Sequence, residues 1–277
     1  MSQANSLQIV LVLYKCALKD SLSYCTLKEN ISCVKQDYEI LVYNNSPEVK
    51  VEEPEGVFVV NAEENKMLVG AYNFALKRAC EKGRSWLLLL DQDTRLSPDF
   101  FNKLSREIDQ NKNYAAIIPM VRKDSFFISP YKYNPRLGLS WCLSPVYAGV
   151  TVDCLAAINT GATLNVRTMV EMGGFNEDFP LDGLDHWYFY QFYKRKESVC
   201  VLDEFLEHNI SLLDYRNSVT PLRYESFLSK GLEFAKMQGC LASLLWRLKT
   251  LLRAFKYLFQ KEEKRRYVVV LLKYVFC

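Results

Sequence analysis

The sequence lacks the features that mark a membrane-spanning, secreted or disulfide-stabilised protein. No apolar run approaches the about 20 residues that a membrane-spanning helix needs, and residues 1–7 have no apolar segment of the signal-peptide kind. The nine cysteines form no C-x-x-C pair, and Cys154 and Cys200 stand inside apolar runs, where cysteine behaves as a small hydrophobic residue. We therefore expect a cytoplasmic protein with reduced thiols, without a zinc site or a disulfide framework.

A large excess of one charge is also absent, because the 277 residues carry a net charge of only +3. The charge is unevenly spread. Residues 241–277 hold nine Lys/Arg and two Glu, a net of +7, whereas the other 240 residues hold 26 Lys/Arg and 30 Asp/Glu, a net of −4. A mildly acidic body with a basic tail predicts no nucleic-acid partner, and an anionic surface as a partner of the tail.

The most informative stretch is a run of five large apolar residues, Trp86 to Leu90, which ends at Asp91 and Asp93. An apolar run without alternation is typical of a strand buried on both faces of a parallel sheet. Ligands of open parallel sheets bind outside the carboxyl ends of the strands. Two carboxylates there predict a site for Mg²⁺ or Mn²⁺, which take oxygen ligands; the alternative is a pair of turn residues that cap the strand.

Strands and helices alternate along the rest of the chain. This alternation predicts an α/β fold, with a mostly parallel sheet, right-handed crossovers and helices on its faces. Residues 122–149 are rich in Pro, Tyr and Ser, and we expect them to form an ordered active-site insertion. The predicted strands are residues 8–14, 38–43, 57–60, 114–121, 198–202 and 204–208, and the predicted helices are residues 20–31, 65–80, 97–110 and 187–196.

Several motifs occur in a fixed order. They are Asn61 to Asn73 (NAEENKMLVGAYN), Asp91-Gln92-Asp93-Thr94, Asn159-Thr160-Gly161, and Gly173 to Phe179 (GGFNEDF) followed by Asp182 and Asp185. Over residues 8–225 this series resembles the inverting glycosyltransferases of family 2, which have the GT-A fold, and within them the rhamnosyltransferase-like branch. A D-x-D motif alone is a weak signal, whereas the ordered series is a strong one.

The resemblance implies a role for each candidate residue. For the metal, it implies Asp93 as a direct ligand, Asp91 in support and His208 at the metal or the diphosphate. For the acceptor hydroxyl it implies Asp185 as general base, with Asp182 as the rival. The implied donor-binding residues are Tyr14, Asn44, Asn45, Asn65, Asn73, Asp91 and Gln92, and the implied acceptor-binding residues are Asn159, Thr160, Gly161 and Trp187.

Structural roles compete with these assignments. Asp182 and Asp185 suit N-caps of the helix that follows, and His208 suits a partly buried histidine near the sheet edge. Trp187 belongs to a segment so rich in aromatic residues that a core position is the better default. His186, the only other histidine, is expected on a helix surface.

The C-terminal part of the chain predicts an amphipathic basic helix. Residues 241–259 place an apolar stripe on one face, with Arg247, Lys249, Arg253 and Lys256 elsewhere on the helix. We expect residues 1–225 to form a GT-A domain and residues 226–277 a helical tail. The tail either packs on that domain or forms a homodimer, or it binds the anionic inner face of the cell membrane near a lipid-linked acceptor. The apolar stripe consists of Leu241, Leu244, Leu245, Leu248, Leu251, Leu252, Phe255, Leu258 and Phe259.

Together these features predict a metal-dependent hexosyltransferase that is peripherally bound to the membrane. The resemblance implies transfer of a sugar, best guessed as rhamnose from dTDP-rhamnose, to a lipid-linked or oligosaccharide acceptor in bacterial surface polysaccharide synthesis (O-antigen or capsule). Two alternatives stay open: an inactive homologue or scaffold that binds a nucleotide sugar, and a nucleotidyltransferase. The latter would need a Gly-rich phosphate loop near the N-terminus, which Tyr14-Lys15-Cys16-Ala17 does not provide.

Overall fold

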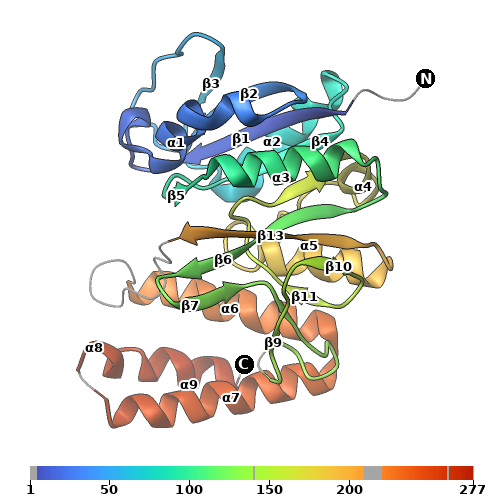
Figure 1. Ribbon diagram of the computed structural model, residues 1–277. Helices are drawn as coiled ribbons and strands as arrows, with labels where there is room; N and C mark the ends of the chain where they lie inside the picture. Colours follow the sequence, from blue (N-terminus) through green and yellow to red (C-terminus); the bar gives the residue numbers. More distant parts are fainter. Residues whose placement is uncertain (1–4, 140, 209–219, 261, 277) are drawn as a thin grey trace.

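The computed structural model describes residues 5–139, 141–208, 220–260 and 262–276 (Figure 1). One curled sheet carries helices on both faces, and helices from the C-terminal part of the chain form a further layer at the bottom of Figure 1. The expected α/β fold with a C-terminal helical appendage is confirmed. Within the described ranges no helix is long and apolar enough to cross a membrane, and the eight described cysteines are free thiols.

The main sheet is parallel where it carries the predicted motifs. Parallel ladders join β4 to β1, β1 to β2, β2 to β3 and β6 to β13, and these ladders contain most of the paired residues. The path through the sheet is β10 (Gly149–Thr151), β13 (Val199–His208), β6 (Ala116–Lys123), β12 (Thr163–Asn165), β4 (Trp86–Leu90), β1 (Ser6–Leu13), β2 (Asp37–Asn44) and β3 (Val57–Asn61). Outside it, β5 (Thr94–Arg95) pairs with β13 and β7 (Phe126–Ser129) with β6, while β11 (Leu155–Ala156), β8 (Tyr131–Lys132) and β9 (Ser144–Pro145) form a small separate sheet.

Helices cover both faces of this sheet. One face packs against α1 (Leu22–Asn30), flanked by 3₁₀ turns at Leu18–Asp20 and Ile31–Cys33, and against α3 (Pro98–Asp109). The other face packs against α2 (Met67–Glu81), α4 (Val166–Glu171) and α5 (Leu184–Lys194). The start of α3 is the one predicted, because the Ser97 hydroxyl accepts a hydrogen bond from the Phe100 amide at 3.0 Å and Pro98 occupies the first turn.

Strand β4 is buried on both faces, as its apolar run predicts. Leu87 and Leu89 pack with α2, α4 and α5, whereas Leu88 and Leu90 pack with α1 and α3. Burial of one leucine side chain contributes about 1.5–3 kcal/mol. The strand therefore fixes the position of the carboxylates that follow it.

Two predicted elements differ from those observed. Residues 198–202 and 204–208 form one strand, β13, in which the register with β6 shifts between Val201 and Phe205; the shift explains why the sequence pattern is interrupted there. Helix α5 begins at Leu184, before the aromatic run, so Asp185 lies inside its first turn rather than ahead of it.

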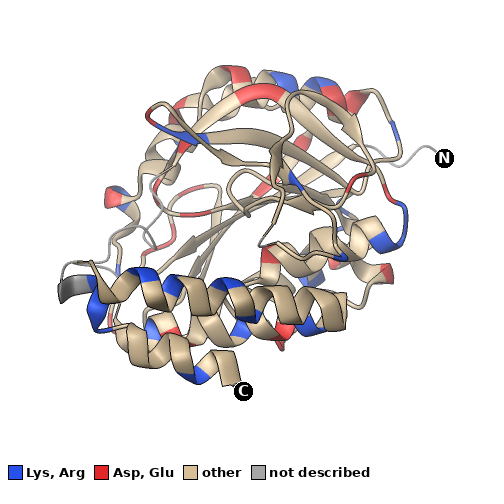
Figure 2. Cartoon of the chain, turned by 90° about the horizontal axis from the view of Figure 1, so that it is seen from below, with Lys and Arg blue, Asp and Glu red and all other residues tan. Residues whose placement is uncertain are grey.

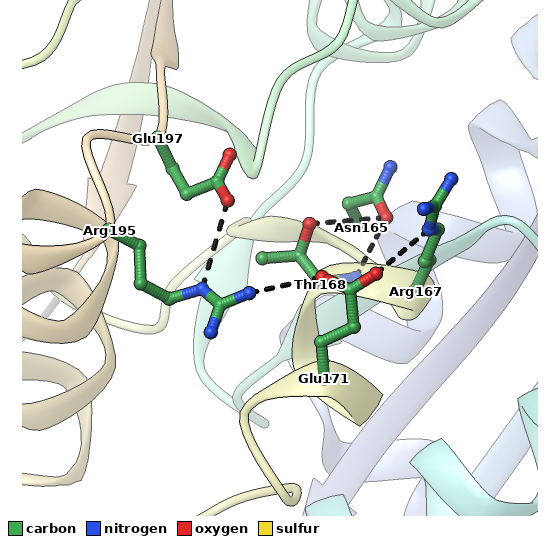
Figure 3. Close-up of polar contacts among 6 residues, drawn as sticks. All are labelled: Asn165, Arg167, Thr168, Glu171, Arg195 and Glu197. Carbon is green, nitrogen blue, oxygen red and sulfur yellow. Dashed lines mark hydrogen bonds and ion pairs between the residues drawn. The ribbon is translucent and has the colours of Figure 1, made fainter.

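A polar network joins α4 to the C-terminal end of α5 (Figure 3). Glu171 accepts hydrogen bonds from Arg167 at 2.9 Å and from Arg195 at 3.0 Å, and Arg195 lies 3.8 Å from Glu197. The side chain of Asn165 caps α4 by accepting from the Thr168 amide at 3.1 Å. Each of these exposed ion pairs contributes only about 0–1 kcal/mol to the free energy of unfolding. The packing of α4 and α5 therefore depends mainly on their buried apolar side chains.

The C-terminal helices are α6 (Pro221–Gln238), α7 (Cys240–Leu258), α8 (Glu262–Arg265) and α9 (Val268–Phe276). Phe234 of α6 packs in the main core, whereas Tyr224 and Leu228 join Tyr257 and Leu271 in a second apolar core. The expected boundary between residues 225 and 226 falls inside α6, and residues 1–4 and 277, at the ends of the two expected units, lie outside the described residues. The division into two units stays a prediction.

Helix α7 packs through the face opposite to its leucine stripe. The side chains of Ala242, Thr250 and Ala254 are buried against the neighbouring helices. Leu244 and Phe255 are 62% and 60% exposed. Small residues let α7 approach its neighbours closely, so the leucine stripe is left on the outside.

Candidate active site

A cleft of about 680 Å³ lies at the carboxyl ends of β1, β2 and β4. Tyr14 follows β1, Asn45 follows β2, and Asp91 follows β4, so three parallel strands deliver their next residues to one place. The predicted site residues that line the cleft are Tyr14, Asn45, Asn65, Asp91, Gln92, Asp93, Asn159, Thr160, Asp185 and His208. No described residue of the segment 122–149 lines this cleft, so its role as an active-site insertion stays a prediction.

The D-x-D segment is held by hydrogen bonds from both sides. The Thr160 hydroxyl donates to the Asp91 carboxylate at 2.7 Å, and Thr160 is itself buried. The Gln92 side-chain oxygen accepts from the Tyr14 amide at 2.8 Å, which joins the ends of β4 and β1. Asp91 is thereby oriented by the predicted acceptor-side turn, while Gln92 supports the backbone beside the donor pocket.

His208 reaches Asp93 because β13 pairs with β5, where His208 lies opposite Thr94. Its Nδ1 is 3.0 Å from the Thr94 hydroxyl and 3.6 Å from an Asp93 carboxylate oxygen. Burial raises the pKa of Asp93, the His208 ring lowers it, and the Asp91 carboxylate raises it further. The net effect is a raised pKa of Asp93, with burial as its largest cause.

These residues fit an open cation site. No described set of three His, Cys, Asp or Glu side chains is close enough to enclose a metal ion without other ligands. Mg²⁺ and Mn²⁺ are often held by only one or two carboxylates together with water and substrate phosphates. Asp93 and Asp91 could supply those carboxylates, with the His208 imidazole beside them, and a cation there would offset the repulsion between the two carboxylates.

The structure places the two candidate bases differently. Asp185 lies in the first turn of α5 and lines the cleft, where its carboxylate accepts from the His186 amide at 2.8 Å. Asp182 does not line the cleft; its side chain is only 6% exposed and forms an ion pair with Arg223. Asp185 is therefore available to an acceptor, whereas Asp182 is engaged.

Arg223 was not predicted from the sequence, yet it lines the cleft beside Leu181 and Asp185. It lies in the first turn of α6, which Thr220 caps and Pro221 opens. A cation there opposes the helix dipole, so a basic residue two positions after the proline of a Thr-Pro helix start was a usable signal. Its guanidinium, which is paired with Asp182, adds a positive charge to a cleft that also holds the carboxylates of Asp91, Asp93 and Asp185.

Two buried tyrosines lie close to the carboxylates of the cleft. The Tyr188 hydroxyl donates to the Asn159 side chain at 3.0 Å, which fixes the turn before Thr160. Burial raises the pKa of Tyr188 and of Tyr72 well above the usual value, and the charges of Asp91 and Asp185 raise both further. Both phenols stay neutral in the core beneath the cleft residues, so they are not candidates for proton exchange.

Four other predicted residues lie away from the cleft wall. Asn44 is fully buried and its amide donates to Asn61 at 2.9 Å, which closes the loop after β2. Asn73 accepts from the Phe175 amide at 2.8 Å and donates to the Phe175 carbonyl at 2.9 Å. Gly161 has a φ of +70° and touches β6 and β13, and Trp187 lies in the main core. These residues shape the loops around the cleft.

The pair Asn73–Phe175 explains a further part of the motif series. Gly174 has a φ of +87°, and a Cβ at that position would lie 2.8 Å from the Asn73 side-chain oxygen. Only glycine fits this conformation and this contact. The Gly-Gly-Phe segment therefore docks on α2 and carries the loop that leads to Asp182 and Asp185.

Comparisons with known proteins agree with this geometry. Residues 20–154 match the family model described as glycosyl transferase family 2. The fold is similar to that of S. aureus TarS residues 1–349 (TM-score 0.52, 12% identity, covering 98% of this chain and 72% of that chain). It is also similar to a mannosyltransferase from Pyrobaculum calidifontis in complex with GDP-Man and Mn²⁺ (TM-score 0.50, 14% identity, 98% and 84% covered). No curated protein sequence matches the chain. The family match covers slightly less than half of the chain, and the two solved structures share its fold.

Proposed function

We propose that the protein transfers a hexosyl group from a nucleoside diphosphate sugar to an acceptor hydroxyl, with inversion at the anomeric carbon. The observation that carries the proposal is the single cleft that joins Asp91, Asp93 and His208 to Asp185 and Arg223. The reaction needs a positive partner for the leaving diphosphate and a base for the attacking hydroxyl. The cleft offers a residue for each requirement.

Each residue has a defined task in this proposal. Asp185 accepts the proton of the acceptor hydroxyl as the oxygen attacks, and its place in the first turn of α5 sets its carboxylate on the cleft wall. Arg223 contacts the leaving diphosphate, because a guanidinium binds phosphate oxygens in a bidentate manner. Asp93 and Asp91, with His208 beside them, would hold Mg²⁺ or Mn²⁺. The bound cation would supply charge neutralisation at the diphosphate.

The donor and acceptor are also part of the proposal. Tyr14, Asn45 and Asn65 line the end of the cleft next to the Asp91 strand end and would contact the nucleotide. The resemblance to the rhamnosyltransferase-like branch makes dTDP-rhamnose the first donor to test. Asn159 and Thr160 lie on the wall next to Asp91 and would contact the acceptor, an oligosaccharide or a lipid-linked sugar of bacterial surface polysaccharide.

We infer that the outer face of α7 binds an anionic membrane surface on the cytoplasmic side. The stripe of Leu241, Leu244, Leu248, Leu252 and Phe255 is exposed along the helix. At 100° per residue, Lys256 flanks one edge of this stripe and Arg247 the other. Figure 2 shows Lys and Arg recurring along the helices on this side of the molecule. An apolar stripe between cationic edges matches a lipid surface with anionic head groups.

A panel of nucleotide sugars tests the proposed chemistry. The purified protein is incubated with each donor, Mg²⁺ or Mn²⁺ and no acceptor, and release of the nucleoside diphosphate is measured. We expect slow hydrolysis of one donor. A scaffold would bind a nucleotide sugar in calorimetry without ever releasing the diphosphate, and a nucleotidyltransferase would instead release pyrophosphate from a nucleoside triphosphate. Either result would contradict the proposal.

A further inference from the structure

Thr94, the residue that follows the D-x-D carboxylates, has no task in the proposed reaction, yet it contacts a side chain of the cleft. Thr94 is fully buried, and its hydroxyl oxygen lies 3.0 Å from Nδ1 of His208. The His208 side chain lines the cleft together with Asp91 and Asp93. A buried hydroxyl therefore lies directly behind one of the candidate cation-binding side chains.

The backbone of Thr94 is held from two sides. The hydroxyl of Ser23, which is also fully buried, accepts from the Thr94 amide at 2.9 Å and donates to the Thr94 carbonyl at 2.9 Å. On the other side, β5 pairs with β13, where Thr94 lies opposite His208. Backbone contacts therefore bring the Thr94 hydroxyl and the His208 ring together, in addition to the hydrogen bond between them.

The two nitrogens of the His208 ring have different surroundings. Nδ1 faces the Thr94 hydroxyl, and a carboxylate oxygen of Asp93 lies 3.6 Å from it. A hydroxyl can donate or accept a hydrogen bond, whereas an ionised carboxylate can only accept one, so these neighbours favour a proton on Nδ1. Nε2 has no hydrogen-bond partner among the residues that the structure describes. The neutral ring then has its free lone pair on Nε2.

We propose that Thr94 is a positioning residue of the candidate cation site: it accepts a hydrogen bond from Nδ1–H of His208 and so leaves Nε2 free to bind the cation. A histidine that binds a metal through one ring nitrogen usually donates its other N–H to an oxygen atom, which fixes the tautomer and the orientation of the ring. Thr94 supplies such an oxygen at 3.0 Å.

This role of Thr94 deepens the proposed function and rests on it. It also distinguishes the two tasks that the family resemblance leaves open for His208, at the metal or at the diphosphate. A ring with its proton on Nδ1 offers a lone pair to Mg²⁺ or Mn²⁺. A hydrogen bond to a phosphate oxygen would instead need a proton on Nε2, because phosphate oxygens accept.

Nuclear magnetic resonance tests the tautomer without turnover. The chain has two histidines, so labelling histidine with ¹⁵N gives the signals of two rings, which His186→Gln assigns. Long-range ¹H–¹⁵N correlations at a pH where the rings are neutral show which nitrogen carries the proton. We expect the Nδ1–H tautomer for His208 in the parent protein and in Thr94→Ser, and a mixture of both tautomers in Thr94→Val. A parent protein with the proton on Nε2 would overturn the proposal.

Titration with Mn²⁺ alone, followed by electron paramagnetic resonance of the free ion, tests the consequence for the cation. Loss of an outer hydrogen-bond partner of a metal-binding histidine lowers metal affinity roughly tenfold to a hundredfold, and we expect this loss in Thr94→Val. Thr94→Ser keeps the hydroxyl and should retain most of the affinity. The matched control is Thr26→Val, because the buried Thr26 hydroxyl supports the same loop by accepting from the Leu96 amide at 3.1 Å. It should lower the melting temperature and leave Mn²⁺ affinity unchanged.

A double-mutant cycle shows whether Thr94 acts through His208. His208→Ala should weaken Mn²⁺ binding, and adding Thr94→Val to it should cause no further loss, because the ring that Thr94 orients is gone. Additive losses in a folded double variant would overturn the proposal. Equal affinities of Thr94→Ser and Thr94→Val would do so as well, and so would a parent protein that binds no Mn²⁺.

These measurements separate the role of Thr94 from the proposed reaction. Mn²⁺ binding is measured without a donor, and release of the nucleoside diphosphate is measured on the parent protein. If Thr94→Val weakens Mn²⁺ binding but the parent protein hydrolyses no donor, the transferase is refuted and the role of Thr94 is kept. If the parent protein hydrolyses a donor only with Mn²⁺ while Thr94→Val binds Mn²⁺ as tightly as the parent, the role of Thr94 alone is refuted.

Discussion

Replacement of Asp185 by asparagine tests the central chemical assignment. Asn keeps the size of the side chain and one oxygen, so it retains the hydrogen bond from the His186 amide and leaves the first turn of α5 intact. It cannot accept a proton at neutral pH. The side chain is 17% exposed and forms no described ion pair with Lys or Arg, so we expect a stability change within about 0.5 kcal/mol.

The magnitude follows from the role of a general base. Positioned proton transfer contributes about 10²–10⁴-fold, which corresponds to roughly 3–5 kcal/mol of the activation barrier. The transfer rate at saturating donor should fall by that factor. Donor affinity should change little, because Asp185 comes from α5, whereas the predicted nucleotide contacts come from the ends of β1, β2 and β4.

Asp182→Asn is the matched control, three residues earlier in the same segment. It weakens the buried ion pair with Arg223, so we expect a loss of stability of about 1–3 kcal/mol and a smaller effect on rate. Single-turnover release of the nucleoside diphosphate, donor calorimetry and thermal melting are measured for both variants. An inactive but folded Asp182→Asn beside a nearly normal Asp185→Asn would refute the assignment of the base.

Three further predictions concern the metal, the loop and the tail. Chelation should abolish turnover and Mg²⁺ or Mn²⁺ should restore it, while Asp93→Asn weakens cation-dependent donor binding; full activity in chelator would contradict the metal role. Both Gly173 and Gly174 have positive φ values (+86° and +87°), so replacing either by alanine should cost about 1–3 kcal/mol of backbone strain. Gly174→Ala should destabilise the protein more than Gly173→Ala, because only at Gly174 would the added Cβ collide with Asn73. Equal melting temperatures of the two variants would refute the docking contact. Replacing Leu248, Leu252 and Phe255 by glutamine should abolish sedimentation of the protein with anionic liposomes. High salt should weaken liposome binding of the parent protein. If the same substitutions instead dissociate a dimer in analytical ultracentrifugation, the stripe binds a second copy of the chain.

Features that depend on local sequence were predictable. The burial of β4 on both faces follows from an apolar run without alternation, and the start of α3 follows from Ser97 and Pro98. The place of Asp91 and Asp93 follows from the same run, because residues after a parallel strand meet at the carboxyl edge of the sheet. Each of these needs only a pattern within about ten residues, so the sequence alone determined it.

Other features depend on contacts between distant segments. His208 reaches Asp93 only because β13 pairs with β5 across more than 100 residues, and a strand pairing of that separation leaves no local pattern. The ion pair between Asp182 and Arg223, 41 residues apart, distinguishes the two candidate bases, although both look alike in sequence. The face of α7 that packs carries Ala242, Thr250, Ala254 and Tyr257, whereas most of the leucine stripe is left outside. Periodicity reveals that a helix has an apolar face, but only the tertiary structure decides whether that face meets the protein or another surface.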